Sequence, residues 1–494
     1  MNTGLDKAIG LLKIVNSTKI NSRPVYELFS LNGYSLWGFF QNHIWEYILS
    51  GPPSTANGVK DNTWRQNFRV FVLRISAITI SLLSFFIILI RRPRVFIFTG
   101  DIVIGNFKND PRIEQVYKYL NARKISYAEL VHTRLSSSFV KNFFKRRRPV
   151  IYLEAIDHLM SLARIFGYRS YFSEINEQDI EQNDAPEDFK DNLKIIIWTC
   201  SQRSERLVFK IKVLSKILSW LGPKALVMID DMRYYHEVIV ASRDAKIETI
   251  SLQHARFNKY IPEWTYYGIP PSLCAVPDKC IVWNDFWKNR LIALSPVFAH
   301  FRDRIIVGGR PHAERRGMTI ARQTQDDVLT MLIPHEVRGD REAILNYIRS
   351  FLFCPNTRIF YLLRRDLSSS KQLREIPREI MGNTDRFKVV YELTPEITSE
   401  ADLVAGTQST LLYEMITIEK PVAIMRNTGM TQASDLIESG MAGYLDLNAP
   451  DICHQLNHLA SVSREELVRR RKILEVKVPI FETFDSIFSP LIRK

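Results

Sequence analysis

The sequence predicts an α/β protein with two doubly wound parallel sheets, preceded by a helical N-terminal region. Short apolar runs alternate with stretches of helical periodicity from residue 94 onward, and the alternation starts again after a polar link at 310–325. Strands that alternate with helices in this way form a parallel sheet covered on both faces. We therefore expect three regions, at 1–93, 94–310 and 311–494.

Length and charge limit the classes of function. The chain has 494 residues, enough for two or three domains, and its 46% hydrophobic and 24% charged residues are typical of a folded globular protein. A net charge of +14 favours an anionic partner, such as a phosphate-bearing substrate or an acidic membrane surface. The spacing of an RRM, KH or zinc-finger module does not occur, so nucleic acid is not expected as a partner. The basic run at 145–148 is interpreted as a solvated face.

The cysteines form no metal-binding pattern. Five of them occur, at positions 200, 274, 280, 354 and 453, without a C-x-x-C pair or a Cys/His metal spacing. We interpret them as free thiols in a reducing compartment. The N-terminus has no basic region followed by an apolar stretch, so no cleaved secretory signal is predicted.

An apolar segment at 70–90 dominates the N-terminal region. Between Arg74 and Arg91 lie sixteen uncharged residues, which as a helix span about 24 Å against the roughly 30 Å of a hydrocarbon core. Residues 70–73 bring the segment near spanning length, and basic residues flank both of its ends. Such flanks suit a helix that lies in an anionic leaflet or dips into it from one side. The alternative is a buried core helix.

Each element of the first series follows from its apolar pattern. Helices are expected where apolar residues recur three and four apart, at 110–120, 155–166, 204–221, 234–243 and 286–294. Strands are expected at the short apolar runs 95–98, 125–128, 149–153, 194–198, 225–229, 247–252, 279–283 and 304–307.

The second series repeats this pattern. Its strands are expected at 327–333, 358–363, 387–391, 402–405 and 421–425, and its helices at 341–353 and in a basic tail at 463–476. Doubly wound sheets bind ligands beyond the carboxyl ends of their strands. We therefore expect a ligand cleft between the two halves, lined by residues that follow strands.

The most specific segment is ADLVAGTQSTLLYEMITIEKPVAIM, residues 401–425. A predicted strand runs into Gly406, and the turn after it carries three hydroxyls, from Thr407, Ser409 and Thr410. Hydroxyls and N–H groups at a helix start suit a phosphate or diphosphate, and Glu414 on the first helical turn could accept hydrogen bonds from ribose. The alternative is a capping turn in which Ser409 is the N-cap and Glu414 is solvated.

This segment resembles the nucleotide-binding stretch of GT-B glycosyltransferases, in which a Gly/Ser/Thr turn holds the donor phosphates and a following Glu holds the ribose. The earlier succession SLQHARFNKYIPEW, DKCIVWNDFWKNRL and RIIVGGRPH is similar to one in bacterial capsule and surface-polysaccharide transferases. These include the teichoic-acid polymerase, sialyltransferase and Kdo-transferase relatives, in which a Gln-His-Gly motif, a strand ending in Trp and a Gly-x-Pro motif follow one another. The resemblance covers residues 95–450.

The resemblance implies two Rossmann-like domains of the GT-B type that face a cleft. Residues 94–310 would form the acceptor domain and 311–494 the nucleotide-sugar domain. Ala255 stands where the family carries Gly, and Arg364-Arg365-Asp366 stands where sialyltransferase-like enzymes carry His-Pro, so the donor is left open.

Sugar transfer needs a base for the acceptor hydroxyl and positive charge for the leaving phosphate. Asp230 and Asp231 end a predicted strand, and a carboxylate beside another is easier to protonate, which suits a base. Their alternative role is an N-cap pair, and His254, which also ends a strand, is the rival base or a structural histidine. The cationic candidates for the donor phosphate are His335, Arg338, Arg364 and Arg365, with solvated surface charges as the alternative. No persuasive D-x-D signature occurs, so neither a metal nor a cofactor is expected.

The predicted function is a metal-independent glycosyltransferase that moves a sugar from a nucleotide donor to a glycan or lipid-linked glycan acceptor in bacterial surface-polysaccharide biosynthesis. It would work at the cytoplasmic face of the inner membrane, with segment 70–90 as its contact. The alternatives are a nucleotide-sugar epimerase or polyol-phosphate transferase of the same fold, or a catalytically inactive GT-B scaffold at the membrane. An epimerase would need no acceptor, and a scaffold would tolerate Glu414→Ala.

Overall fold

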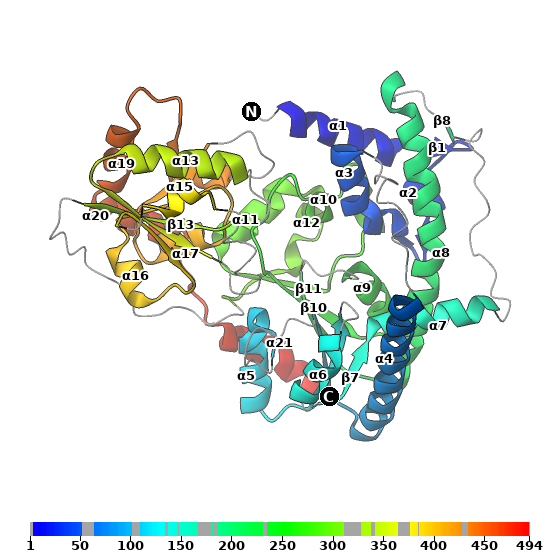
Figure 1. Ribbon diagram of the computed structural model, residues 1–494. Helices are drawn as coiled ribbons and strands as arrows, with labels where there is room; N and C mark the ends of the chain where they lie inside the picture. Colours follow the sequence, from blue (N-terminus) through cyan, green and yellow to red (C-terminus); the bar gives the residue numbers. More distant parts are fainter. Residues whose placement is uncertain are drawn as a thin grey trace. The chain divides into compact units, whose positions relative to one another are not determined.

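The chain folds into two compact units, each built round one parallel sheet (Figure 1). Unit 1 comprises Met1–Ala313 together with Lys477–Lys494, and unit 2 comprises Glu314–Val476. The computed structural model describes residues 3–51, 64–100, 109–133, 137–146, 148–165, 180–181, 185–230, 235–310, 328–336, 341–363, 376–383, 385–426 and 433–493. The predicted fold class, an α/β protein with two Rossmann-like sheets, is confirmed.

The sheet of unit 1 has seven strands in the order β12-β11-β10-β9-β5-β6-β7. All neighbours are parallel. The strands are β5 (Val95–Gly100), β6 (Tyr127–His132), β7 (Val150–Tyr152), β9 (Ala225–Ile229), β10 (Glu248–Leu252), β11 (Lys279–Val282) and β12 (Ile305–Val307). The chain winds one way from β5 to β7 and the other way from β9 to β12. The strand order therefore reverses between β5 and β9, which is where doubly wound sheets bind ligands.

Helices connect these strands, and one of them replaces a predicted strand. They include α5 (Glu114–Ala122), α6 (Ser137–Arg146), α7 (Leu153–Ile165), α8 (Lys190–Leu221), α9 (Tyr235–Asp244), α10 (Pro262–Thr265), α11 (Asp285–Leu294) and α12 (Pro296–His300), with the 3₁₀ turns η2 (Pro111–Ile113), η4 (Glu187–Phe189), η5 (Pro271–Leu273) and η6 (Arg302–Arg304). The strand expected at 194–198 is wrong, because these residues lie inside α8. The buried residues Leu193, Ile196, Ile197 and Cys200 recur three and four apart, so the isoleucine run is the inner face of a helix.

The basic run at 145–148 is not a solvated face in the part that the structure describes. Arg146 is buried, and its Nη1 lies 2.7 Å from Oε2 of Glu129 on β6. Arg148 is half-buried, with its Nη1 3.7 Å from the same carboxylate, whereas Lys145 is exposed. The prediction is wrong for the two arginines because a carboxylate buried in the sheet requires cationic partners.

The N-terminal region belongs to unit 1 and consists of helices joined by short strands and turns. They are α1 (Thr3–Ser17), β1 (Lys19–Ile20), β2 (Arg23–Pro24), α2 (Val25–Leu28), β3 (Ser30–Leu31), β4 (Tyr34–Ser35), η1 (Leu36–Phe40), α3 (Gln41–Ser50) and α4 (Trp64–Arg91), and β1 also pairs with β8 (Ile180–Glu181). Asn16 joins three of them, because its Oδ1 accepts hydrogen bonds from Trp37 Nε1 at 2.8 Å and Gln41 Nε2 at 2.9 Å. Phe39 stacks on His236 of α9 with ring centroids 5.1 Å apart.

His236 is expected to destabilise unit 1 in acid. Burial lowers its pKa from the ordinary value of 6.5 to about 4. Below pH 6.5 the unfolded chain binds a proton that the folded protein does not bind until about pH 4. The free energy of unfolding should therefore fall by about 3 kcal/mol across this window and no further below it. Urea titrations at pH 7, 5.5 and 4.5 would measure this, and His236→Phe should flatten the difference. An equal slope in the variant would contradict the assignment to His236.

The C-terminal helix α21 (Ile480–Arg493) packs in unit 1, although the sequence analysis placed all of 311–494 in the second domain. Phe484 and Phe488 pack on the ring of Tyr119 in α5, with centroids 5.3 and 5.6 Å away. A Cβ at Gly308 would lie 2.6 Å from Cγ2 of Thr483, so the glycine permits this close approach. The apolar face of α21 therefore packs on α5, a helix from a much earlier part of the sequence.

Unit 2 repeats the doubly wound pattern with six strands in the order β15-β14-β13-β16-β17-β18. All pairs are parallel. The strands are β13 (Leu329–Pro334), β14 (Thr357–Leu362), β15 (Phe387–Val390), β16 (Leu403–Gly406), β17 (Val422–Met425) and β18 (Gly443–Leu445). The helices include α13 (Arg341–Phe353), α15 (Arg378–Met381), α16 (Pro395–Glu400), α17 (Leu411–Thr417), α18 (Ser434–Glu438), α19 (Ile452–Ala460) and α20 (Arg464–Ile473). Residues of α13, α15 and α19 share one core cluster on one face of the sheet (Figure 1). The strand order reverses between β13 and β16.

A disulfide closes this core. Cys354, just after α13, is bonded to Cys453 in α19. The expectation of five free thiols is therefore wrong for these two, whereas Cys200, Cys274 and Cys280 are free and buried. The pairing has no local signal in the sequence because 99 positions separate the two cysteines.

Opening the disulfide is expected to lower the free energy of unfolding of unit 2 by about 2–4 kcal/mol. The cross-link restricts the unfolded chain over a loop of 99 positions, and long loops gain the most from closure. Urea unfolding of the full chain with and without dithiothreitol measures the difference. The double variant Cys354→Ser, Cys453→Ser should match the reduced protein and should not respond to the reductant. Equal stability of the oxidised and reduced wild type would contradict the prediction.

Candidate functional site

The candidate site of unit 2 lies where its strand order reverses. β13 and β16 are neighbours there, and both are followed by polar residues at the carboxyl edge of the sheet. His335 and Glu336 follow β13, while the turn at 407–410 leads from β16 into α17. The predicted nucleotide segment is therefore placed at the point where doubly wound sheets bind ligands.

Glu336 organises this turn from inside. One of its carboxylate oxygens, Oε1, accepts hydrogen bonds from the backbone N–H groups of Thr407, Gln408 and Ser409, each at 2.9 Å. The Thr407 hydroxyl donates to the other oxygen. Glu336 is only 8% exposed. The turn thus has the geometry of an anion-binding nest, and its occupant is a carboxylate of the same chain.

Gly406 is required by this arrangement. A Cβ at this position would lie 2.9 Å from Oε1 of Glu336 and 3.3 Å from side-chain carbons of Leu412 and Pro334. The glycine at the end of β16 therefore lets the carboxylate reach the three N–H groups. The sequence predicts Gly406 as a site residue, and its role in the structure is to leave room for the Glu336 carboxylate.

The polar side chains of the turn form an inner, buried set and an outer, partly exposed set. Thr407 is buried against Glu336, whereas Gln408, Ser409 and Thr410 are half-exposed. Ser409 Oγ accepts a hydrogen bond from the backbone N–H of Leu411 at 3.2 Å, and the N-cap residue of α17 is the next residue, Thr410. The expectation that the N–H groups of this turn face an incoming phosphate is corrected for 407–409, because those groups donate to Glu336.

The other predicted residues of unit 2 have different placements. Glu414 is half-buried in the first turn of α17. His335 is half-buried, and its Nδ1 lies 2.9 Å from the hydroxyl of Tyr361 on β14. Arg338, Arg364 and Arg365 lie outside the described residues.

The candidate site of unit 1 likewise lies where the strand order reverses. Asp230 directly follows β9 and is buried, with Oδ1 accepting a hydrogen bond from the backbone N–H of His254 at 3.0 Å. This bond joins the carboxyl ends of β9 and β10. Asp231 and the residues that lead from it to α9 lie outside the described residues, so the N-cap alternative for the pair stays a prediction.

His254 differs from Asp230 in exposure. Its side chain is half-exposed at the carboxyl edge of the sheet, while its backbone is held by Asp230. The preceding Gln253 is buried and fixes the same segment, because its Oε1 accepts from Trp283 N at 3.0 Å and its Nε2 donates to Ala255 O at 2.9 Å. The Gln-His succession thus consists of a buried amide that ties β10 to β11, followed by an accessible imidazole.

Two functional candidates were missed by the sequence analysis. His132 ends β6, and its Nδ1 contacts Oε1 of Glu154 at the start of α7. Glu154 also accepts from the backbone N–H of Thr133 at 3.2 Å. The second candidate is Glu336. The available signal for both was a titratable residue at the end of a strand or within two residues of it, which is the same signal that selected His254.

Burial makes the Cys280 thiol, which lies near Asp230, unreactive. Burial is the main cause that raises the pKa of the Cys280 thiol on β11, and the Asp230 charge adds to it. The thiol is therefore neutral and inert at physiological pH. Within the described ranges, no group of three or more His, Cys, Asp or Glu side chains could hold a metal ion.

No protein-family model and no curated protein sequence matches the chain. Solved structures match over most of its length at low identity. A UDP co-structure of MnaA from S. aureus is 12% identical, with 81% of this chain and 97% of that chain covered and a TM-score of 0.45. The glycotransferase of kitacinnamycin is 13% identical, with 81% and 99% covered and a TM-score of 0.47. The lipopolysaccharide outer core galactosyltransferase WaaB is 13% identical, with 80% and 99% covered and a TM-score of 0.46. Neither an activity nor a substrate follows from these likenesses of backbone.

Proposed function

We propose that the protein is a glycosyltransferase that moves a sugar from a nucleotide-activated donor to a glycan acceptor. The observation that carries this proposal is the turn at 407–410, which Glu336 holds at the strand-order reversal of unit 2. A second support is His254 of unit 1, a partly exposed histidine that follows β10 and whose backbone is held by Asp230 at the end of β9. The turn of unit 2 and Asp230 of unit 1 each lie at a strand-order reversal, where doubly wound sheets bind ligands.

In this proposal unit 2 binds the donor. Glu336 fixes the backbone of the turn from inside, and the side-chain amide of Gln408 and the hydroxyls of Ser409 and Thr410 contact the donor phosphates. Glu414 accepts hydrogen bonds from the ribose hydroxyls. Glu336 is thus a positioning residue, and the phosphate contacts come from side chains of the turn.

In the same proposal unit 1 supplies the base. His254 takes the proton of an acceptor hydroxyl while that oxygen bonds to the anomeric carbon of the sugar, and the bond from this carbon to the phosphate oxygen breaks. Asp230 holds the backbone of His254 and so fixes the position of the imidazole. A lipid-linked surface glycan is the proposed acceptor, in keeping with the net charge of +14 and the apolar face described below.

A second candidate function is an inactive module of the same fold. The specific observation in its favour is that the N–H groups of residues 407–409 already donate to a carboxylate of the chain. An inactive module needs no donor, and this internal occupant would serve only to fix the turn.

Thermal unfolding of the full chain with UDP, GDP, CDP and CMP, and with sugars linked to them, tests the choice. A ligand at 100 times its dissociation constant should add about 2.7 kcal/mol to the free energy of unfolding. One nucleotide should stabilise the wild type and the control Glu475→Ala, whose side chain is exposed in unit 2, and should fail to stabilise Glu414→Ala. No response to any nucleotide would favour the inactive module. Turnover of the donor without an acceptor into an epimeric sugar would contradict the transferase.

A further inference from the structure

Helix α4 is fixed along the edge of the unit 1 sheet by one of its faces. The buried residues of that face are Leu73, Ala77, Ser81, Ser84 and Ile88, which recur three and four apart. Two serines bond to β7, the edge strand: Ser84 Oγ accepts from the N–H of Val150 at 3.1 Å, and Ser81 Oγ accepts from the N–H of Tyr152 at 3.0 Å. The helix therefore satisfies backbone donors that the edge strand would otherwise leave unpaired. Figure 1 shows α4 alongside β7 and α7.

The opposite face of α4 is apolar and exposed. It carries Phe71, Val72, Ile75, Leu82, Leu83, Phe86, Ile87 and Ile90, of which Ile90 is 84% exposed. Trp220, at the end of α8, is 66% exposed, and its ring packs on that of Phe85 of α4 with the ring centroids 6.1 Å apart. We call the exposed apolar residues of α4 together with Trp220 the α4 stripe. The segment Phe71–Arg91 is long and apolar enough to cross a membrane, and only 28% of its apolar 18-residue window is buried. A contiguous apolar surface of this kind marks an interaction site.

The charges around the α4 stripe are basic. α4 contains no acidic residue; Arg74 is exposed between Phe71 and Ile75, near the start of the stripe, and Arg91, Arg92 and Arg94 are exposed at its other end. On α8, Lys216 is exposed one turn before Trp220. Basic residues at the ends of an apolar face complement an anionic lipid surface, where each adds about 1 kcal/mol of attraction.

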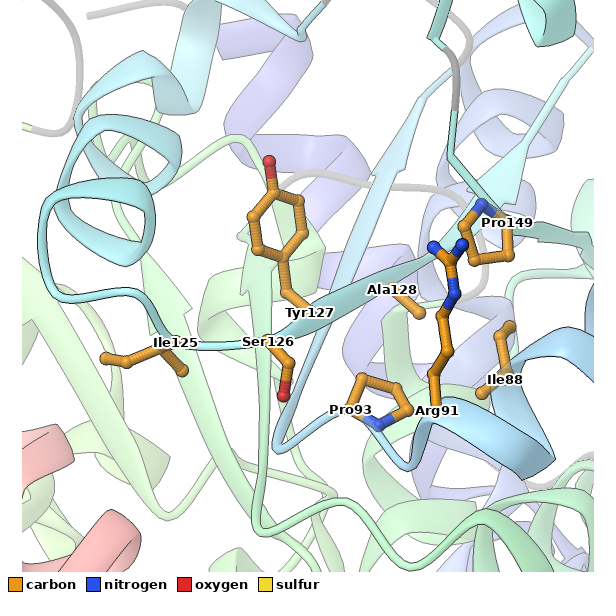
Figure 2. Close-up of a pocket in the computed structure, with 8 residues that line it drawn as sticks. All are labelled: Ile88, Arg91, Pro93, Ile125, Ser126, Tyr127, Ala128 and Pro149. Atoms are coloured by element: carbon orange, nitrogen blue, oxygen red, sulfur yellow. The ribbon is translucent and has the colours of Figure 1, made fainter.

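A pocket of about 210 Å³ lies at the carboxyl end of α4 (Figure 2). Its walls come from that end of the helix and from the starts of β5, β6 and β7, and they are Ile88, Arg91, Pro93, Ile125, Ser126, Tyr127, Ala128 and Pro149. Figure 2 shows the Arg91 side chain reaching across to Pro149. The pocket is at the amino edge of the sheet, whereas His254 is at the carboxyl edge. The pocket therefore adjoins the carboxyl end of the α4 stripe and lies at the opposite edge of the sheet from His254.

We propose that the α4 stripe docks unit 1 onto the surface of an anionic lipid bilayer. The helix lies in the plane of the headgroup and acyl boundary, with its serine face on the sheet and its apolar face in lipid. Crossing the bilayer would strip α4 from β7 and leave the N–H groups of Val150 and Tyr152 without their acceptors. This proposal stands apart from the glycosyltransferase function, because it uses no residue of either candidate site.

Vesicle flotation of the full chain tests the proposal. The protein should bind vesicles of phosphatidylcholine with 30% phosphatidylglycerol at least tenfold better than vesicles of phosphatidylcholine alone, and 0.5 M salt should weaken the binding. The double variant Phe86→Asp, Ile90→Asp should bind at least thirtyfold more weakly. The control is Phe353→Asp, which changes a phenylalanine of unit 2 that is as exposed (85%) as Ile90 (84%), and it should bind within twofold of the wild type. Substitution of Arg91 and Arg92 by Glu should remove the preference for the anionic lipid.

Three results would overturn the proposal. The first is absence of binding by the wild type, and the second is undiminished binding by the double variant. The third is a wild-type dimer in lipid-free buffer that the double variant converts to a monomer, since a second copy of the chain would then cover the α4 stripe. Circular dichroism and thermal unfolding must show that the double variant is folded. The nucleotide response of unit 2 should be the same in wild type and double variant, so failure of docking and failure of the proposed function remain distinguishable.

Discussion

Replacement of His254 by Ala is expected to lower sugar transfer by about 10²–10⁴-fold at saturating donor. General base catalysis contributes this much, and His254 is a partly exposed histidine that follows β10, one strand from the strand-order reversal of unit 1. Binding of the donor should be unchanged, because its proposed contacts all lie in unit 2. The measurement is the release of nucleotide from the donor found by the thermal screen, in the presence of acceptor, over pH 5–9.

Two variants separate the base from its support. Asp230→Asn keeps an oxygen that can accept from the His254 N–H, so its loss of turnover should be smaller than that of His254→Ala. The control His300→Ala removes an exposed histidine of unit 1 and should leave turnover unchanged. Wild-type turnover in His254→Ala would contradict its role as the base, and the His132–Glu154 pair would become the candidate to examine.

The relation between Asp230 and His254 shows what the sequence could provide. Residues that follow apolar strands are at the carboxyl edge of a parallel sheet, and this rule selected both residues, which the structure joins by a hydrogen bond. The roles proposed for Asp230 and His254 differ because the exposure of the two residues differs. Asp230 is buried and His254 is half-exposed, a difference that arises from the packing of β9, β10 and β11 together. The apolar pattern therefore predicts two alternative bases, and it does not show which of them is exposed.

The features that the sequence analysis missed are contacts between distant parts of the chain. Glu336 reaches a turn 71 positions later, Cys354 pairs with Cys453, and α21 packs on α5. Periodicity reports which face of an element is apolar but not which other element will cover it. The isoleucine run at 194–198 failed for a related reason, because a short apolar run fits a strand or a buried helix equally well and only tertiary packing selects between them.

Replacement of Glu336 by Ala is expected to lower the free energy of unfolding of unit 2 by about 3 kcal/mol. Three backbone N–H groups and the Thr407 hydroxyl would lose their acceptor, and each unsatisfied donor costs about 1–3 kcal/mol unless water replaces the carboxylate. Donor affinity should fall at least tenfold, since the outer side chains of the turn would no longer be held in place. Glu336→Gln keeps an acceptor oxygen and should show a smaller loss in both quantities. Urea unfolding and nucleotide titration measure them.

Gly406→Ala provides an independent route to the same change. The added Cβ would lie 2.9 Å from Oε1 of Glu336, so the carboxylate must leave the turn or the turn must move. If the glycine is needed only to admit the carboxylate, the double variant Gly406→Ala, Glu336→Ala should be little less stable than Glu336→Ala alone. Additive losses of stability would show that Gly406 has a separate backbone role, and an unchanged donor affinity in all three variants would remove the turn from the donor site. Because the cycle compares the same turn with and without its internal anion, it tests the geometry on which the proposed function depends.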